Sequence, residues 1–179
     1  MDHYREEGKV WRLDMKERLK ALNIMFIDPY EKPVLHAGWS AFEDDKAFEQ
    51  RKKLISEGQF QAARDSMKEV TAFDLRCVDR CDFLICHVDM RVRMCGTWDE
   101  IYRAADSHKP VLIMSATGVS DLPPWLFGRF PVEFFFESWD ALWGYIQHID
   151  GAEEIDTLKN RWKFFDWSKL FEEVGLKTA

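Results

Sequence analysis

The sequence predicts an α/β fold in which helices cover both faces of a doubly wound, mainly parallel sheet. Short apolar runs of strand length alternate along the chain with longer segments whose apolar residues recur at helical spacing. The clearest three elements follow one another as strand, helix and strand, and such a βαβ unit is expected to be parallel and right-handed. No repeat, low-complexity tract or linker divides the 179 residues, so we expect one domain spanning residues 1–179.

The first half of the chain is expected to hold three helices and one strand. Residues 10–22 place leucines among charges and predict a helix, whereas the apolar run of residues 23–28 (NIMFID) predicts a buried strand. Residues 40–64 are rich in Glu, Lys, Gln and Ala and predict a helix with a break near Gly58. Apolar residues at helical spacing in residues 67–80 predict a further helix.

The second half alternates more clearly between apolar strands and helices. We expect strands over residues 82–88, 110–115 and 131–136, and helices over residues 97–108 and 138–149. The C-terminal tail is rich in Trp and Phe and is expected to pack as one or two helices. Together these elements predict a three-layer sandwich of the Rossmann-like or flavodoxin-like type.

Composition limits which partners the protein can bind and which cell compartment it occupies. The formal net charge of -7 disfavours binding to polymeric nucleic acid, whose phosphates are held by dense Lys and Arg surfaces, but it leaves nucleosides and nucleotides open. The polar start MDHYREEGKV is unlike a signal peptide, and no apolar run approaches membrane-spanning length. The sequence therefore predicts a cytoplasmic protein with no membrane partner.

The cysteines point to the same compartment. They are Cys77, Cys81, Cys86 and Cys95. They form no CxxC pair and have no histidine at zinc-ligand spacing, so we expect neither a metal site nor a redox motif. All lie in or beside apolar segments, where a free cysteine behaves as a small hydrophobe. This fits a reducing environment.

Ligands of doubly wound sheets bind at the carboxyl ends of the strands. The predicted strand ends are at Asp28, Val88 and Ser115. After Val88 the loop reaches Gly96-Thr97, where a helix is expected to begin with Glu100 in its first turn. Free backbone N–H groups and the helix dipole would keep Glu100 ionised there. Such a carboxylate can capture a sugar C1′ that develops oxocarbenium character as its base leaves.

The same residues have a purely structural interpretation. Thr97-x-x-Glu100 fits a capping box, in which Thr97 caps the amide of the third helical residue and Glu100 reaches back to the amide of the capping residue. Local spacing alone leaves both interpretations of Glu100 open.

Residues 74–111 resemble the core of the nucleoside 2-deoxyribosyltransferase superfamily. The segment reads DLRCVDRCDFLICHVDMRVRMCGTWDEIYRAADSHKPV. The family pattern is an Asp in a helix, a second Asp opening a strand eight residues later, a loop with a Gly-containing turn, a Glu-led helix rich in Ala, and Lys-Pro before the next strand. The positions in register with this pattern are Asp74, Asp82, Gly96, Glu100, Ala104 and Lys109-Pro110.

The resemblance implies roles for two carboxylates. Glu100 matches the family's nucleophile, which forms a covalent glycosyl-enzyme intermediate. Asp74 matches an acidic residue that faces the nucleobase and manages its proton as it leaves. The alternative for Asp74 is an ordinary helix charge beside Arg76 or Lys68. Asp82 precedes its strand at the end opposite the site, so we expect it to be structural.

Further substrate contacts are expected around the same loop. Asp89 is expected to bind ribose hydroxyls, with an ordinary turn Asp as the alternative. Arg91 and Arg93 are expected to hold a 5′-phosphate, with exposed loop arginines as the alternative. Asp28, Gly96 and Thr97 complete the expected substrate-binding set. His87 alternates with apolar residues in a strand and is expected to be a core residue.

Two departures from the family pattern bear on the reaction. Met94 stands where a second Asp often assists proton transfer to the base, which makes hydrolysis more expected than transfer to an acceptor base. The family's first strand is expected to be missing or replaced, because the chain starts where the turn after that strand would end. This favours the alternative of a non-catalytic nucleotide-binding or assembly protein that retains the fold.

The leading hypothesis is an enzyme that cleaves the N-glycosidic bond of a nucleoside, deoxynucleoside or nucleoside 5′-monophosphate. The glycosyl group would pass through a Glu nucleophile to water or to another base. No metal ion or organic cofactor is required for this chemistry. Relatives in the superfamily are commonly homo-oligomers, so the resemblance also implies a homo-oligomer.

Overall fold

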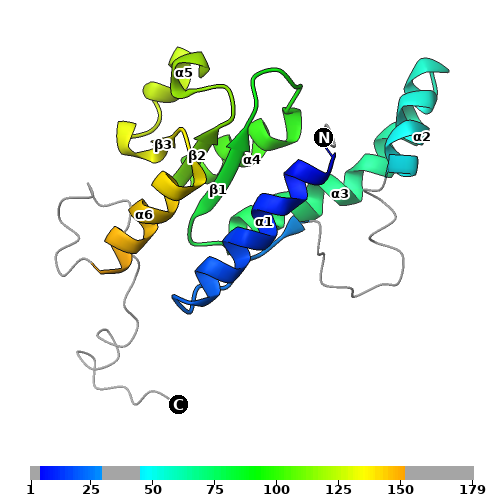
Figure 1. Cartoon of the computed structure of the whole chain (residues 1–179). Coiled ribbons are helices and arrows are strands. Elements are labelled where there is room, and N and C mark those ends of the chain that lie inside the picture. Colours follow the sequence, from blue (N-terminus) through cyan, green and yellow to red (C-terminus); the bar gives the residue numbers. More distant parts are fainter. Residues whose placement is uncertain (1–4, 30–44, 152–179) are drawn as a thin grey trace, which may run out of the picture.

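The computed structural model describes residues 5–29 and 45–151 and shows a mixed α/β architecture (Figure 1). In chain order its elements are α1 (Arg5–Lys20), α2 (Asp45–Ser56), α3 (Phe60–Arg80), β1 (Leu84–Val88), α4 (Cys95–Asp106), β2 (Val111–Ser115), the 3₁₀ turn η3 (Val119–Asp121), α5 (Pro124–Phe127), the 3₁₀ turn η4 (Val132–Phe134), β3 (Phe135–Phe136) and α6 (Trp139–Asp150). None of the helices in these ranges combines the length and apolarity needed to cross a bilayer.

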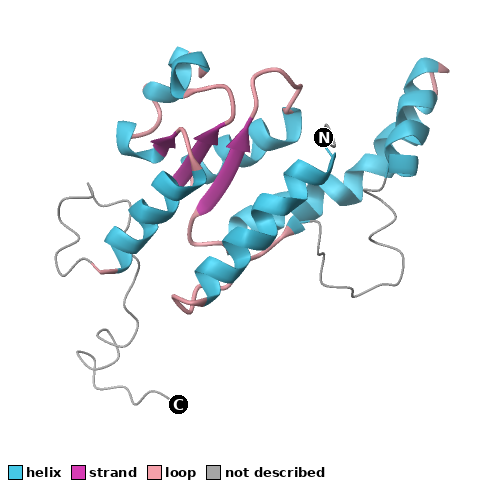
Figure 2. Cartoon of the chain, viewed as in Figure 1, coloured by secondary structure: helices cyan, strands magenta, loops and turns pink. Residues whose placement is uncertain are grey.

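The strands form a three-stranded parallel sheet in the order β1-β2-β3 (Figure 2). Leu84 of β1 lies opposite Val111 of β2, and Phe135 of β3 lies opposite Ile113 of β2. The predicted βαβ unit with parallel strands is therefore confirmed as β1-α4-β2. The central strand β2 is buried along its whole length, as its continuous apolar sequence predicts.

Helices cover both faces of the sheet. Successive side chains of a strand point to opposite faces, so these apolar strands present hydrophobic residues on both faces. On one face, α4 and the end of α3 pack on the sheet together with α5 and its flanking loops. The buried residues there are Val78, Cys86, Val88, Ile101, Ala104, Ala105, Val111, Ile113, Leu122, Leu126, Phe130 and Phe135. On the other face α1 and α6 lie side by side (Figure 1). The buried residues there are Trp11, Met15, Leu19, Leu112, Met114, Phe134, Phe136, Leu142 and Ile146.

His87 of β1 points to the face that α1 and α6 cover. Its ring centroid lies 6.3 Å from that of Trp11 on α1 and 5.8 Å from that of Trp139 on α6. The two indoles stack on one another with centroids 4.4 Å apart. His87 is partly buried and packs against these aromatic rings, so the predicted core position is confirmed in part.

The predicted strand over residues 23–28 is wrong. α1 ends in a Schellman motif in which Asn23 has a φ of 57° and the amide of Ile24 donates to a carbonyl of the last helical turn at 3.0 Å. Ile24 and Phe26 then pack against the α1–α6 core, whereas Met25 is 82% exposed. The apolar run of this segment therefore packs on helices, and no described strand pairs with it.

The helix predicted over residues 40–64 is confirmed in its central part. α2 begins at Asp45, and the break falls at Gly58, whose φ of 72° a residue with a Cβ rarely adopts. Residues 40–44 lie outside the described residues. α3 then starts at Phe60, earlier than the sequence periodicity indicates, because the apolar stripe becomes clear only from Met67 onwards.

Two boundaries in the second half differ from the prediction. α4 begins at Cys95 and ends at Asp106, two residues ahead of its predicted range. The last strand is limited to Phe135–Phe136, because the chain after Pro131 first makes the 3₁₀ turn η4. The predicted helical tail lies outside the described residues.

Candidate functional site

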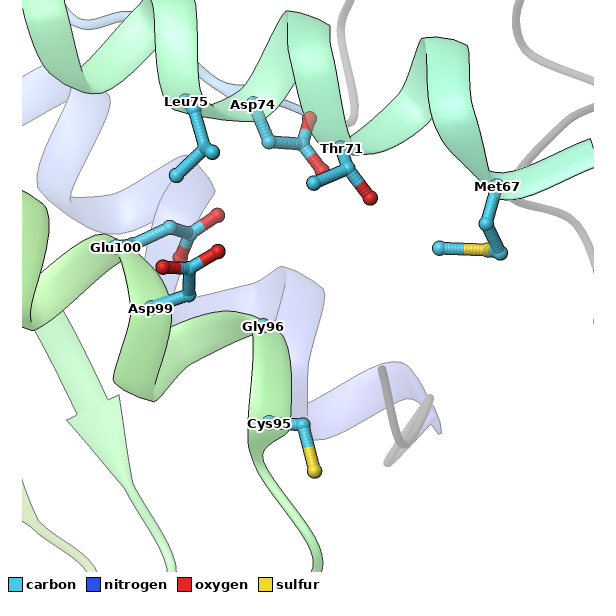
Figure 3. A pocket seen from close by; sticks show the side chains of 8 residues that line it. All are labelled: Met67, Thr71, Asp74, Leu75, Cys95, Gly96, Asp99 and Glu100. Carbon is cyan, nitrogen blue, oxygen red and sulfur yellow. The ribbon is translucent and has the colours of Figure 1, made fainter. Parts of the chain in front are cut away.

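A cavity lies between α3 and α4 (Figure 3). Its volume is about 280 Å³, close to the lower end of the roughly 300–1,000 Å³ range of small-molecule sites. The lining residues are Met67, Thr71, Asp74 and Leu75 from α3, and Cys95, Gly96, Asp99 and Glu100 from α4. Because α4 follows the loop after β1, the cavity lies toward the carboxyl end of that strand, where ligands of parallel sheets bind.

Helical periodicity explains why these residues share one cavity. Residues three and four positions apart lie on the same face of a helix. On α3 the lining residues follow this spacing from Met67 to Asp74. On α4 the adjacent pair Cys95-Gly96 is repeated one turn later by Asp99-Glu100. The cavity is thus bounded by one stripe of each helix.

The structure brings together the two carboxylates that the sequence singled out. Asp74 comes from α3 and is 6% exposed, and Glu100 comes from α4 and is partly buried. Figure 3 shows both side chains directed into the space between the two helices. Two carboxylates on separate helices therefore face one small-molecule-sized space.

The capping-box interpretation of Glu100 is wrong. The residue at the N-cap of α4 is Met94, and no side chain caps this helix. Thr97 is already helical, and the amide of Trp98 donates to the carbonyl of Met94 at 2.9 Å. Glu100 accordingly lies in the second helical turn instead of the first. Its Cα–Cβ bond tilts toward the helix N-terminus, as in every α-helix, so the carboxylate extends back along the cavity.

Gly96 leaves the space that the cavity occupies. A Cβ placed on Gly96 would meet no atom within 4 Å. The absence of a side chain at this position of α4 therefore widens the gap to α3 in front of Glu100. Of the substrate-binding residues predicted from the sequence, Gly96 is the one that lines the cavity.

Two contacts fix α3 against the α4–β2 segment on the C-terminal side of the cavity. Arg103 of α4 donates from Nε and Nη2 to the two carboxylate oxygens of Asp79 at 2.8 Å each. The ammonium of Lys109 donates to the backbone carbonyls of Val78, Asp79 and Cys81 at 2.6, 2.7 and 2.6 Å. These carbonyls belong to the end of α3, where the last helical C=O groups have no partner within the helix.

Glu100 lies close enough to the thiol of Cys86 to affect its pKa. Burial raises the pKa of Cys86 well above its usual value, and the negative charge of Glu100 raises it further. Cys86 lies on β1 in the core that α4 covers. The negative charge of Glu100 is therefore felt inside this core as well as in the cavity. Cys95, by contrast, is exposed and lines the cavity itself.

The remaining predicted contact residues do not line the cavity. Asp89 accepts hydrogen bonds from the amide and side chain of Arg91, at 2.9 Å from N and Nε and 2.8 Å from Nη2. These bonds lower the pKa of Asp89. They also stabilise the turn after β1, so Asp89 has the ordinary turn role that was the alternative to ribose binding. Arg93 is exposed, and Asp28 pairs with Arg12 at 3.7 Å. Thr97 lies outside the lining stripe of α4.

Met94 is also directed away from the cavity. Its sulfur accepts a hydrogen bond from the amide of Asp89 at 3.2 Å, and its side chain packs against the core between α4 and the sheet. Met94 therefore stabilises the loop after β1. It cannot transfer a proton, unlike the Asp that the family often has at this position.

Sequence reasoning missed Asp99, the third carboxylate of the lining. The spacing of four residues from Cys95 to Asp99 could have indicated it, but only once α4 is known to start at Cys95. Within residues 5–29 and 45–151, no group of three or more His, Cys, Asp or Glu side chains is arranged to hold a metal ion.

The chain matches no protein-family model, and a comparison of its sequence with curated proteins gives no match.

Proposed function

We propose that this protein cleaves the N-glycosidic bond of a nucleoside or nucleotide at the cavity between α3 and α4. The observation that carries the proposal is the meeting of Asp74 and Glu100 from separate helices at one cavity. N-glycoside cleavage requires two such groups, since one must meet the sugar carbon and the other the leaving base. The resemblance of residues 74–111 to the deoxyribosyltransferase superfamily assigns the same two residues to those roles.

Glu100 acts as the nucleophile in this proposal. Its carboxylate oxygen forms a bond to C1′ while the bond from C1′ to the base nitrogen breaks, and the bonding electron pair leaves with the base. Asp74 donates a proton to the departing nitrogen. Water or a second base then attacks C1′ and gives a proton back to the Asp74 carboxylate, while the bond from C1′ to Glu100 breaks and Glu100 is released as a carboxylate.

The surroundings of the two carboxylates support this division of roles. Asp74 is buried on α3, where a base stacked against Met67 and Leu75 would place its nitrogen atoms near the carboxyl group. Glu100 faces it from α4 across the gap that Gly96 leaves open. A flat base on the α3 side and a sugar on the α4 side fit this layout.

A direct test measures free base released from a panel of nucleosides, deoxynucleosides and their 5′-monophosphates. Glu100→Gln should lower release by about 10³-fold or more, because removal of a nucleophile abolishes the covalent step. Asp74→Asn should affect substrates with poor leaving bases most strongly. Glu69→Gln is the matched control, since Glu69 is an exposed carboxylate on α3 outside the cavity lining.

The outcomes separate the two hypotheses drawn from the sequence. Mass spectrometry of rapidly quenched wild-type protein should show a glycosyl group on Glu100. Equal base release by wild type and Glu100→Gln would reject the proposal. Ligand binding without base release would favour the non-catalytic nucleotide-binding alternative.

The proposal includes three expectations about the whole molecule. We infer a doubly wound, Rossmann-like sheet, which the parallel strands and the helices on both faces support. We also infer a homo-oligomer, following the resemblance, and a cytoplasmic location, following the free cysteines. Size-exclusion chromatography with light scattering tests the oligomer directly.

A further inference from the structure

Asp99 places a third carboxylate in the cavity, next to Glu100. Both residues belong to the lining, and Figure 3 shows their side chains extending from the same turn of α4. Asp99 is exposed, whereas Glu100 is partly buried and Asp74 is 6% exposed. Asp99 is thus the carboxylate on the solvent side of the cavity.

The charge of Asp99 is balanced only at longer range, by Arg103 one turn later on α4. Among the described residues, none forms a hydrogen bond or an ion pair with its carboxylate. The nearest cation in sequence at helical spacing, Arg103, donates instead to both oxygens of Asp79. The carboxylate of Asp99 is therefore available to whatever enters the cavity.

The cavity lining offers a phosphate no cationic side chain. None of its lining residues is Lys, Arg or His. Arg91, which the sequence suggested as a phosphate ligand, is held by Asp89 in the turn after β1, and Arg93 lies outside the lining. Phosphate sites in proteins are normally built from such side chains or from helix N-termini. The first turn of α4 does reach the lining at Cys95 and Gly96, but its partial charge of about +0.5 is outweighed by the carboxylates of Asp99 and Glu100.

We propose that Asp99 is a specificity-determining residue that restricts the site to sugars without a 5′-phosphate. This inference rests on the proposed function and narrows its substrate class to uncharged nucleosides. A furanose is small, so a phosphate on a sugar whose C1′ contacts Glu100 lies well within the Debye length of about 10 Å from the neighbouring carboxylate. A phosphate dianion is then repelled, whereas a free sugar hydroxyl can donate a hydrogen bond to Asp99.

The test compares kcat/KM for a deoxynucleoside and for its 5′-monophosphate in wild type, Asp99→Asn and Asp99→Lys. Removing one repulsive charge should raise the relative efficiency toward the monophosphate by about tenfold, and reversing the charge should raise it further. Glu69→Gln should leave the ratio unchanged. Added salt should narrow the preference of wild type more than that of Asp99→Asn, because salt screens an exposed charge more strongly than the partly buried charge of Glu100. A merely structural role for Asp99 would not produce this salt dependence.

The results distinguish failure of this inference from failure of the proposed function. A wild type that releases base, together with ratios that do not change in either Asp99 variant, overturns the inference alone. If wild type releases no base, the proposed function fails, and calorimetric binding of the same two compounds decides the inference. A monophosphate that gains affinity only in the Asp99 variants supports it. Equal affinity in all proteins, or binding by none of them, overturns it.

Discussion

Arg103 on α4 donates two hydrogen bonds of 2.8 Å to the carboxylate of Asp79 on α3. This bidentate contact lowers the pKa of Asp79 and joins the two helices whose facing stripes line the cavity. The contact is exposed, so on its own it adds little to stability. Its value is geometric, because a bidentate arginine fixes the orientation of its partner as well as the distance. Lys109 reinforces the same junction from the start of β2.

Replacing Lys109 should therefore loosen the junction. Lys109→Met removes three hydrogen bonds to backbone carbonyls at the end of α3 and should lower the free energy of unfolding by about 2 kcal/mol. Thermal unfolding followed by circular dichroism measures the loss. Lys109→Arg should recover part of it, since a guanidinium can still donate to these carbonyls. Unchanged stability in Lys109→Met would show that water satisfies the carbonyls equally well.

Gly96 permits a test that separates the fold from the site. Gly96→Ala should stabilise the protein by up to about 1 kcal/mol, because alanine is the better helix former and its Cβ meets no atom within 4 Å. Gly96→Trp should keep the fold but fill the cavity, so ligand binding and base release should be lost. Chemical denaturation and calorimetric binding measure the two effects. A Gly96→Trp protein that binds nucleosides normally would place the site elsewhere.

The cysteines should differ strongly in reactivity. Cys95 is exposed at the cavity and should react with a maleimide in the native protein, whereas Cys86 should not. Burial and the charge of Glu100 raise the pKa of Cys86, so it stays a protonated thiol at neutral pH. Peptide mass spectrometry after timed labelling locates the modified residue. A saturating nucleoside should protect Cys95, and labelling of Cys86 in the native state would contradict its buried position on β1.

The Asp89–Arg91 contact should make a small contribution to acid stability. Hydrogen bonds from Arg91 lower the pKa of Asp89 in the folded state. The ionised carboxylate then stabilises the fold above its unfolded pKa of about 3.9, and this contribution is lost as the pH falls through the lower folded value. Because Arg91 is exposed, the effect should be about 0.5 kcal/mol.

Urea unfolding of wild type and Asp89→Asn at neutral and acidic pH measures this contribution. The stability difference between the two proteins should be present at neutral pH and disappear once the pH falls below the lowered folded-state pKa of Asp89. Arg91→Met should reproduce the pattern, since it removes the same contact. A difference that grows on acidification would mean that Asp89 is stabilised in its protonated form.

Much of the fold follows from local sequence patterns. The apolar run of β2 and the helical stripes of α3 and α4 each depend on residues within a few positions of one another, and the structure contains all three elements. Errors occur where a local pattern has more than one physical origin. Residues 23–28 form an apolar run because Ile24 and Phe26 pack on helices, and nothing in the local pattern reveals the absence of a pairing strand.

The sequence by itself determined the βαβ unit and identified Asp74 and Glu100 as a pair of interest. Only the tertiary structure decided that Asp99 joins them at one cavity and that Asp89 and Arg91 bind each other instead of facing it. The physical reason is the range of the interactions involved. Periodicity and strand propensity are set by near neighbours, whereas the facing of α3 and α4 depends on where each helix begins and on the packing and hydrogen bonds that fix one against the other.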